Sequence, residues 1–115
     1  MEFQFSDYHS IGVSLLGLVC VLAIGTSVAV LAGKHHLQRP AWSAIALVLL
    51  ASLQLLGWGV VHGAHGFYLP AEARLDAVME GFGPALNAFA LGIMSSTTAA
   101  AVMVVSAFRV ALIKA

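Results

Sequence analysis

The chain has 115 residues, enough for one small domain, and residues 1–115 are treated as a single membrane domain. Apolar residues make up 61% of it and charged residues 9%, against about 45–50% and about 25% in soluble proteins, which excludes an ordinary soluble domain. Five lysine and arginine residues balance five aspartate and glutamate residues, so no basic surface is left for nucleic acid. The composition indicates an integral membrane protein.

The first two predicted membrane spans are uncharged apolar segments. Residues 11–33 form a run of 23 residues and residues 41–61 a run of 21, and about 20 are needed to cross the hydrocarbon core of a bilayer. Pro40 lies just ahead of the second run, where its missing N–H removes no helical hydrogen bond. Trp42 and Trp58 lie near the two ends of that run, as interfacial aromatic residues do.

A short amphipathic helix is predicted between the second and third spans. It starts after Pro70, with Glu72 in its first turn and Leu75 and Met79 on its apolar face. Two glycines and then Pro84 follow, which predicts a kink or break at this point.

The third predicted span covers residues 84–113, with Arg109 as its only charged residue. At about 1.5 Å per residue it would extend about 45 Å, which is longer than the hydrocarbon core. We therefore expect it to tilt or to leave the membrane at one end, with Arg109 reaching the headgroups.

The charges between the spans predict the orientation. The first loop and the C-terminal tail are basic, and the second loop is mostly acidic. These charges are Lys34 and Arg39 in the first loop, Glu72, Asp76 and Glu80 against Arg74 in the second, and Arg109 and Lys114 in the tail. Basic segments stay in the cytoplasm. The predicted fold is an all-α integral membrane protein with three transmembrane helices, an outside N-terminus and a cytoplasmic C-terminus.

Small residues recur every four positions in the third span and predict a helix-packing ridge. Such a row lets two helix backbones approach closely, where packing replaces the hydrophobic drive that lipid removes. The ridge consists of Pro84, Ala88, Gly92, Ser96 and Ala100. We expect a closely packed helical assembly that contains more than one chain.

Four polar residues within the spans need partners that lipid does not supply. Gln54 lies in the second span, and Asn87, Ser95 and Thr98 lie beside the ridge of the third. One interpretation is hydrogen bonding across helices, or to carbonyls one turn back. The other is that Asn87, Ser95 and Thr98 line a narrow wet passage between several copies.

The histidines provide the one candidate for a cofactor site. The predicted topology puts His9, His62 and His65 at the same outer surface, and the last two have the i, i+3 spacing of some metal sites. Histidines from two helices can also hold haem. No carboxylate or cysteine joins the set, so we expect neither metal nor cofactor. No nucleophile–base pair or phosphate loop is recognised, and the chain is not expected to be an enzyme.

The segment "VMEGFGPALNAFALGIMSSTTAAAVMVV", residues 78–105, resembles the pore helix of the MotA/TolQ/ExbB proton-channel family. A start marked by glycine and proline is followed by small residues and a hydroxyl patch, and the resemblance covers about residues 41–109. The chain has seven residues, 34–40, where the family has a large cytoplasmic domain, so it resembles a small, truncated member.

The resemblance implies a ring of identical subunits, usually a pentamer, around a single-span partner that carries the protonatable carboxylate. It assigns the pore-facing hydroxyl to Thr98 or Ser95 and the polar entrance to Asn87. It implies location in the bacterial inner membrane, with lipid, further copies and a partner helix as neighbours.

Three functions remain open from the sequence. The first is a subunit that oligomerises or packs around a partner helix as a proton-channel or stator-like component. The second is an accessory or anchor subunit of a larger respiratory, photosynthetic or transport complex. The third is a redox anchor that uses His9, His62 or His65 to hold haem.

Overall fold

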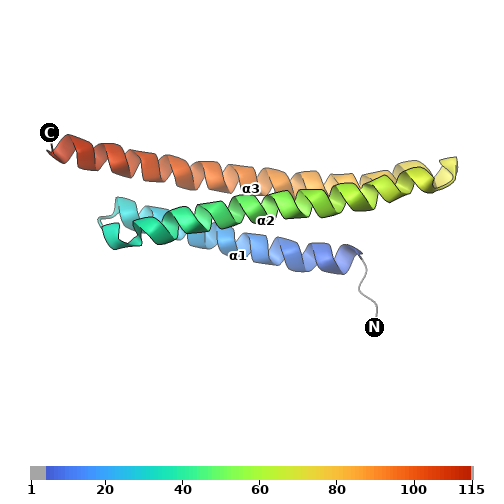
Figure 1. Cartoon of the computed structure of the whole chain (residues 1–115), viewed down its shortest axis with the longest axis horizontal. Helices are drawn as coiled ribbons and strands as arrows, with labels where there is room; N and C mark the ends of the chain where they lie inside the picture. The colour runs from blue at the N-terminus through green and yellow to red at the C-terminus, as the bar shows by residue number, and fades with distance from the viewer. Residues whose placement is uncertain (1–4, 115) are drawn as a thin grey trace.

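Three long helices make up most of the molecule. The computed structural model describes residues 5–114, and the side chains of residues 9–113. The helices are α1 (Phe5–Leu31), α2 (Gln38–Ala64) and α3 (Ala71–Lys114), joined by the 3-10 turns η1 (His35–Leu37) and η2 (His65–Tyr68) (Figure 1). Within the described residues, three helical segments are long and apolar enough to cross a membrane, which agrees with the three predicted spans.

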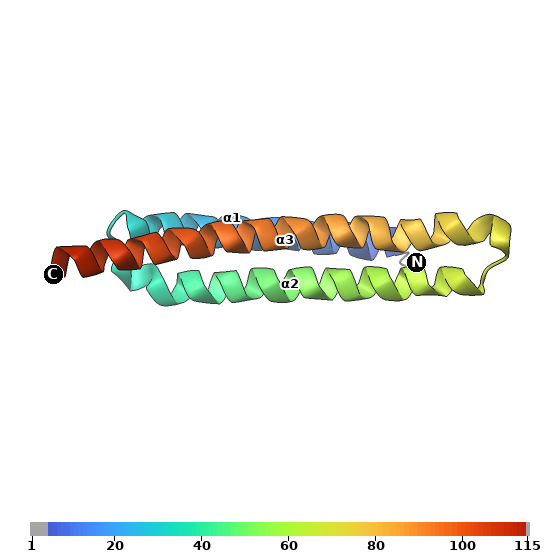
Figure 2. The same ribbon diagram turned by 90° about the horizontal axis from the view of Figure 1, so that it is seen from above.

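The helices lie side by side as a narrow bundle. α2 runs opposite to α1 and α3, and each helix packs against the other two (Figures 1 and 2). The molecule extends 66 × 29 × 13 Å. α3 sets the long dimension, because its 44 residues span about 66 Å at 1.5 Å per residue. At one end, the hairpin formed by α2 and α3 extends beyond the first turn of α1 (Figure 1).

The sequence predicted a kink or a break before the third span, and the helix is not broken there. Residues 71–114 form one uninterrupted helix with Pro84 inside it, and the short amphipathic helix is the beginning of α3. Proline removes one N–H and crowds both the carbonyl four residues earlier and the preceding residue. The preceding residue is Gly83, which has no Cβ to meet the proline ring. Gly81 and Ala85, on either side, are buried against α2, and this contact supports the helix through Pro84.

A glycine ends α1 and starts the turn into α2. Gly33 has a positive φ of 110°, which glycine adopts without steric cost. Its N–H donates to Val30 O at 3.0 Å, and the next N–H, of Lys34, donates to Ala29 O at 3.0 Å. These are the two bonds of the Schellman motif, which satisfies carbonyls that the end of a helix leaves unpaired.

The buried residues of each helix follow alternating spacings of three and four. A mean spacing of about 3.5 residues is that of a coiled-coil seam, which keeps one face of a helix on its neighbour over many turns. Most of the seam residues on α2 and α3 are small. The seams are Leu16, Cys20, Ala23, Ser27 and Val30 on α1; Ala41, Ile45, Val48, Ser52, Leu55 and Gly59 on α2; and Gly81, Ala85, Ala88, Gly92, Ser95 and Ala99 on α3.

Candidate functional site

The backbones of α2 and α3 come close together because glycines face each other. A Cβ added at Gly59 would lie 2.7 Å from Gly81 O and would also meet the side chain of Ala85. One added at Gly92 would lie 2.7 Å from Ser52 Oγ. These distances leave no room for a methyl group, so the small residues are required where they occur.

The predicted ridge lies only partly in this contact. Ala88, Gly92 and Ser96 are buried, whereas Pro84 and Ala100, at the two ends, are half-buried. A row of residues spaced strictly by four turns about 40° around the helix at each step. The two ends of such a row therefore turn away from the packed seam, whose residues have a mean spacing of about 3.5.

The four consecutive hydroxyl residues divide between the interior and the surface. Ser95 and Ser96 are buried, and Thr97 and Thr98 are exposed. Ser96 Oγ donates to Ile93 O at 3.1 Å, and Thr98 Oγ1 donates to Met94 O at 2.8 Å. Bonds of this kind, to carbonyls one turn back, satisfy hydroxyl groups without any second helix.

Asn87, Ser95 and Thr98 do not lie on one face. Asn87 and Thr98 are both exposed and eleven residues apart, which is close to three full turns of helix. Ser95 is about 80° away from Asn87 around the axis and faces the interior of the bundle. The structure therefore places two of the three residues of the predicted lining on the outer face of α3.

Serines that the sequence reasoning did not single out lie inside the bundle. Ser27, Ser52 and Ser106 are buried, as are Ser95 and Ser96. Ser52 Oγ donates to Leu49 O at 2.9 Å. Ser27 is 0% exposed, and its Oγ has no hydrogen-bond partner among the described residues. The alternation of three and four along each helix was the signal that could have located these serines.

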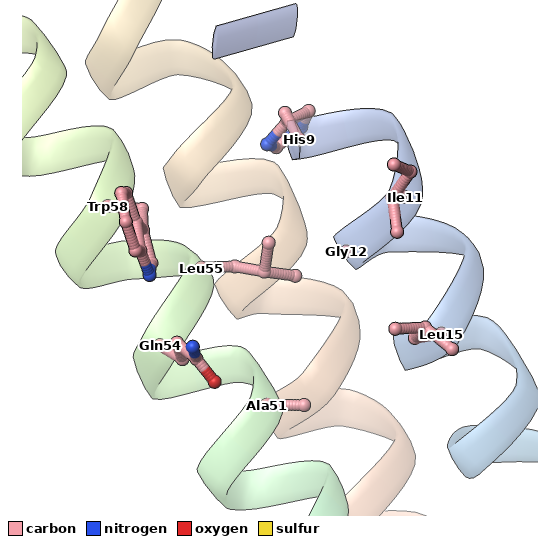
Figure 3. Close-up of a pocket in the computed structure, with 8 residues that line it drawn as sticks. All are labelled: His9, Ile11, Gly12, Leu15, Ala51, Gln54, Leu55 and Trp58. Carbon is pink, nitrogen blue, oxygen red and sulfur yellow. The ribbon is translucent and has the colours of Figure 1, made fainter. Parts of the chain in front are cut away.

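A groove between α1 and α2 brings together Gln54, Trp58 and His9 (Figure 3). We call it the α1–α2 groove; its volume is about 240 Å³. Gln54 and Trp58 are four residues apart on α2 and so share a face of the helix. His9 lies in the first turns of α1. Its proximity to Gln54 and Trp58 depends on the packing of α1 against α2, which residue spacing does not reveal.

The predicted histidine set is spread over three elements. His9 is on α1, His62 on α2 and His65 on η2, where it is exposed. Among the side chains of residues 9–113, no group of three histidine, cysteine, aspartate or glutamate residues is placed to hold a metal ion.

No protein-family model matches the chain, and comparisons with curated proteins and with solved structures found no match. The resemblance of residues 41–109 to the MotA/TolQ/ExbB family therefore stays a prediction from the sequence.

Proposed function

We propose that the chain is a multi-pass membrane subunit that acts by packing the outer face of α3 against further transmembrane helices. The observation that carries this proposal is the exposed amide of Asn87, on the part of α3 that follows Pro84. Lipid offers such an amide no hydrogen bond, whereas a neighbouring helix does.

The residues around Asn87 also favour helix packing on the outer face of α3. Ala90, Thr97, Thr98 and Ala101 are exposed on α3, and their small side chains permit close approach of another helix. Large residues are exposed on α3 too, among them Leu86 and Met94, so its outer face mixes small, large and polar side chains. The exposed residues of α1 between positions 9 and 31 include no amide, and most are large and aliphatic and suit contact with acyl chains. Those of α1 include Leu15, Leu18, Val21, Leu22 and Val28.

The first candidate for the neighbour is a further copy of the chain. Following the family resemblance, several copies would form a ring in the bacterial inner membrane, with Thr98 toward a central partner helix as in a stator-like proton channel. Residues 84–108 contain no charged side chain, so a carboxylate for proton transfer would come from the partner. The alternative is an accessory subunit whose α3 face docks on a larger complex.

Native mass spectrometry of protein extracted in lipid nanodiscs tests the association. We expect particles heavier than one 12.0 kDa chain, and we expect Asn87→Leu and Ala90→Leu to reduce them to single chains. Ala46→Leu is the matched control, because Ala46 is an exposed alanine on α2, outside the proposed face. Multiples of the chain mass favour the ring, and one copy within a larger particle favours the accessory subunit. A wild-type chain that is always found alone would refute both.

A further inference from the structure

Four polar residues recur at intervals of eleven along α3. They are Asp76, Asn87, Thr98 and Arg109, and all four are exposed; we call them the α3 stripe. Eleven residues make just over three helical turns, so each member lies only about 20° further around the axis than the one before. The buried Gly92, which packs on α2, lies about 160° around the axis from Asp76. The α3 stripe therefore follows one outer face for about 50 Å, on the side away from α2.

The α3 stripe carries opposite charges at its two ends. Asp76 begins it, with Glu80 one turn further along the same face, and Arg109 ends it beside the last turn of α1. Residues 8–71 and 81–115 contain no aspartate or glutamate, so the segments around Arg109 supply no carboxylate side chain to pair with it. A neighbour that matches the α3 stripe therefore needs basic groups at one end and an acidic group at the other.

Neither a second α3 nor a phospholipid complements the α3 stripe. Copies with one orientation in a membrane have parallel α3 helices, so two stripes in contact would bring Asp76 near Asp76 and Arg109 near Arg109. Like charges that face each other across a helix pair disfavour that pairing, as they do at the edges of coiled coils. A phospholipid spans one leaflet, about half of a bilayer whose hydrocarbon core is about 30 Å thick. It would therefore meet only one of the two charged ends.

We propose that the α3 stripe binds a transmembrane helix of a different chain, which carries basic residues beside Asp76 and Glu80 and an acidic residue beside Arg109. Between these charged ends, the amide of Asn87 hydrogen-bonds to a polar group of the partner. A row with eleven-residue spacing is followed by a right-handed crossing, whereas the seam with α2, of spacing about 3.5, is left-handed. The partner therefore crosses α3 with the opposite hand to α2. This inference rests on the packing face proposed above and names the helix that covers it.

Two designed peptides test the proposed partner. Both have an alanine–leucine core and about the length of α3. The basic–acidic peptide has lysines in its first three turns and a glutamate in its last turn, and the neutral peptide has glutamines at all of these positions. Each is incorporated with the chain into nanodiscs of a neutral phospholipid.

A photo-cross-linking residue captures what lies against the stripe. It replaces Met94, which is exposed and five full turns from Asp76, or Leu18, which is exposed on α1 and serves as the matched control. We expect the basic–acidic peptide to be captured at Met94 about three- to tenfold more than the neutral peptide. At Leu18 we expect no such preference.

Charge variants locate the contact on the stripe. Asp76→Asn combined with Glu80→Gln should remove most of the preference for the basic–acidic peptide. Tyr68→Lys combined with Ala71→Lys changes the net charge by the same amount at exposed positions outside the stripe, and should leave the preference intact. Arg109→Gln should lower the yield of the basic–acidic peptide, but not that of a peptide whose glutamate is replaced by glutamine, as expected for a direct pair.

The identity of the captured molecule separates this inference from the proposed packing face. Pairs of chains joined at Met94 in place of the peptide would overturn the inference and keep the packing face. Equal yields of the two peptides would overturn it as well. Adducts with phospholipid alone would contradict both the inference and the packing face.

Discussion

Gly57 and Gly59 lie two residues apart on α2 and have opposite surroundings. A Cβ at Gly57 would have no atom within 4 Å, whereas one at Gly59 would meet Ala85 and the backbone of Gly81. Backbone atoms on a packed helix cannot rotate away as a flexible side chain can. The two positions therefore separate the effect of close packing from that of replacing glycine in a helix.

We expect Gly59→Ala to destabilise the bundle by about 1–3 kcal/mol, the usual cost of forcing an extra group into a packed interior. Gly57→Ala should leave the bundle as stable or stabilise it by up to about 1 kcal/mol, because the added methyl group meets no atom and alanine has the higher helix propensity. Unfolding of both variants in mixed micelles with increasing SDS measures the difference. Equal stability of the two variants would contradict the close contact between α2 and α3.

The sequence shows which residues are polar, but it did not predict on which face of the helix each of them lies. The polarity of Gln54, Asn87, Ser95 and Thr98 is evident from the sequence, but Ser95 is the one buried member of this set. A helix with small residues on several sides offers more than one face for packing. Contacts with α1 and α2 decide between these faces, and spacing within α3 does not.

At the scale of helices, hydropathy predicted three apolar spans, whereas the glycine and proline pattern wrongly predicted a break in α3. Runs of uncharged residues long enough to cross a bilayer are an unambiguous signal. Pro84 and its neighbouring glycines favoured a break, but the contact of Gly81 and Ala85 with α2 outweighs this local preference. The pairing of distant segments is not visible in a local pattern. α3 is therefore longer than the predicted third span by residues 71–83.

The length of α3 has a measurable consequence for its surroundings. A helix of about 66 Å is more than twice as long as a hydrocarbon core of about 30 Å. Residues 71–80 carry four charged side chains, Glu72, Arg74, Asp76 and Glu80, and lie beyond the first turn of α1 (Figure 1). We expect this part of α3 to stand in water and the middle of α3 to stand in lipid.

Leu75 and Met94 test this expectation, since they are 71% and 69% exposed on the same helix. In membranes, Leu75→Cys should react rapidly with a water-soluble maleimide. Met94→Cys should react at least about tenfold more slowly, because a thiol inside the membrane, whether it faces lipid or another helix, ionises poorly. The native Cys20 is buried and contributes little background. Similar rates at both positions would show that the middle of α3 lies in water.

At the scale of the whole molecule, the charges separate to the two ends of the bundle. The turn between α1 and α2 has Lys34 and Arg39, and Arg109 lies at the same end, where its guanidinium donates to Leu31 O at 3.4 Å. The acidic start of α3 lies at the opposite end (Figure 1). This separation supports the orientation with the first loop in the cytoplasm.

The orientation is tested by labelling from one side of the membrane. In spheroplasts, we expect an impermeant maleimide to label Glu72→Cys directly and Lys34→Cys only after the membrane is permeabilised. Both positions are exposed in the bundle, so a difference in reaction reports the side of the membrane. The reverse pattern would invert the orientation predicted from the charges.

The uninterrupted course of α3 also gives the molecule the geometry of a lever. In the proposed membrane setting, its two ends emerge into different aqueous compartments. A tilt of about 10° around its middle would displace each end by about 6 Å, in opposite directions. Because α2 packs closely against α3 at the glycine contacts, α3 resists bending and tilts as a rigid body. A force applied at Glu72 would therefore displace Arg109.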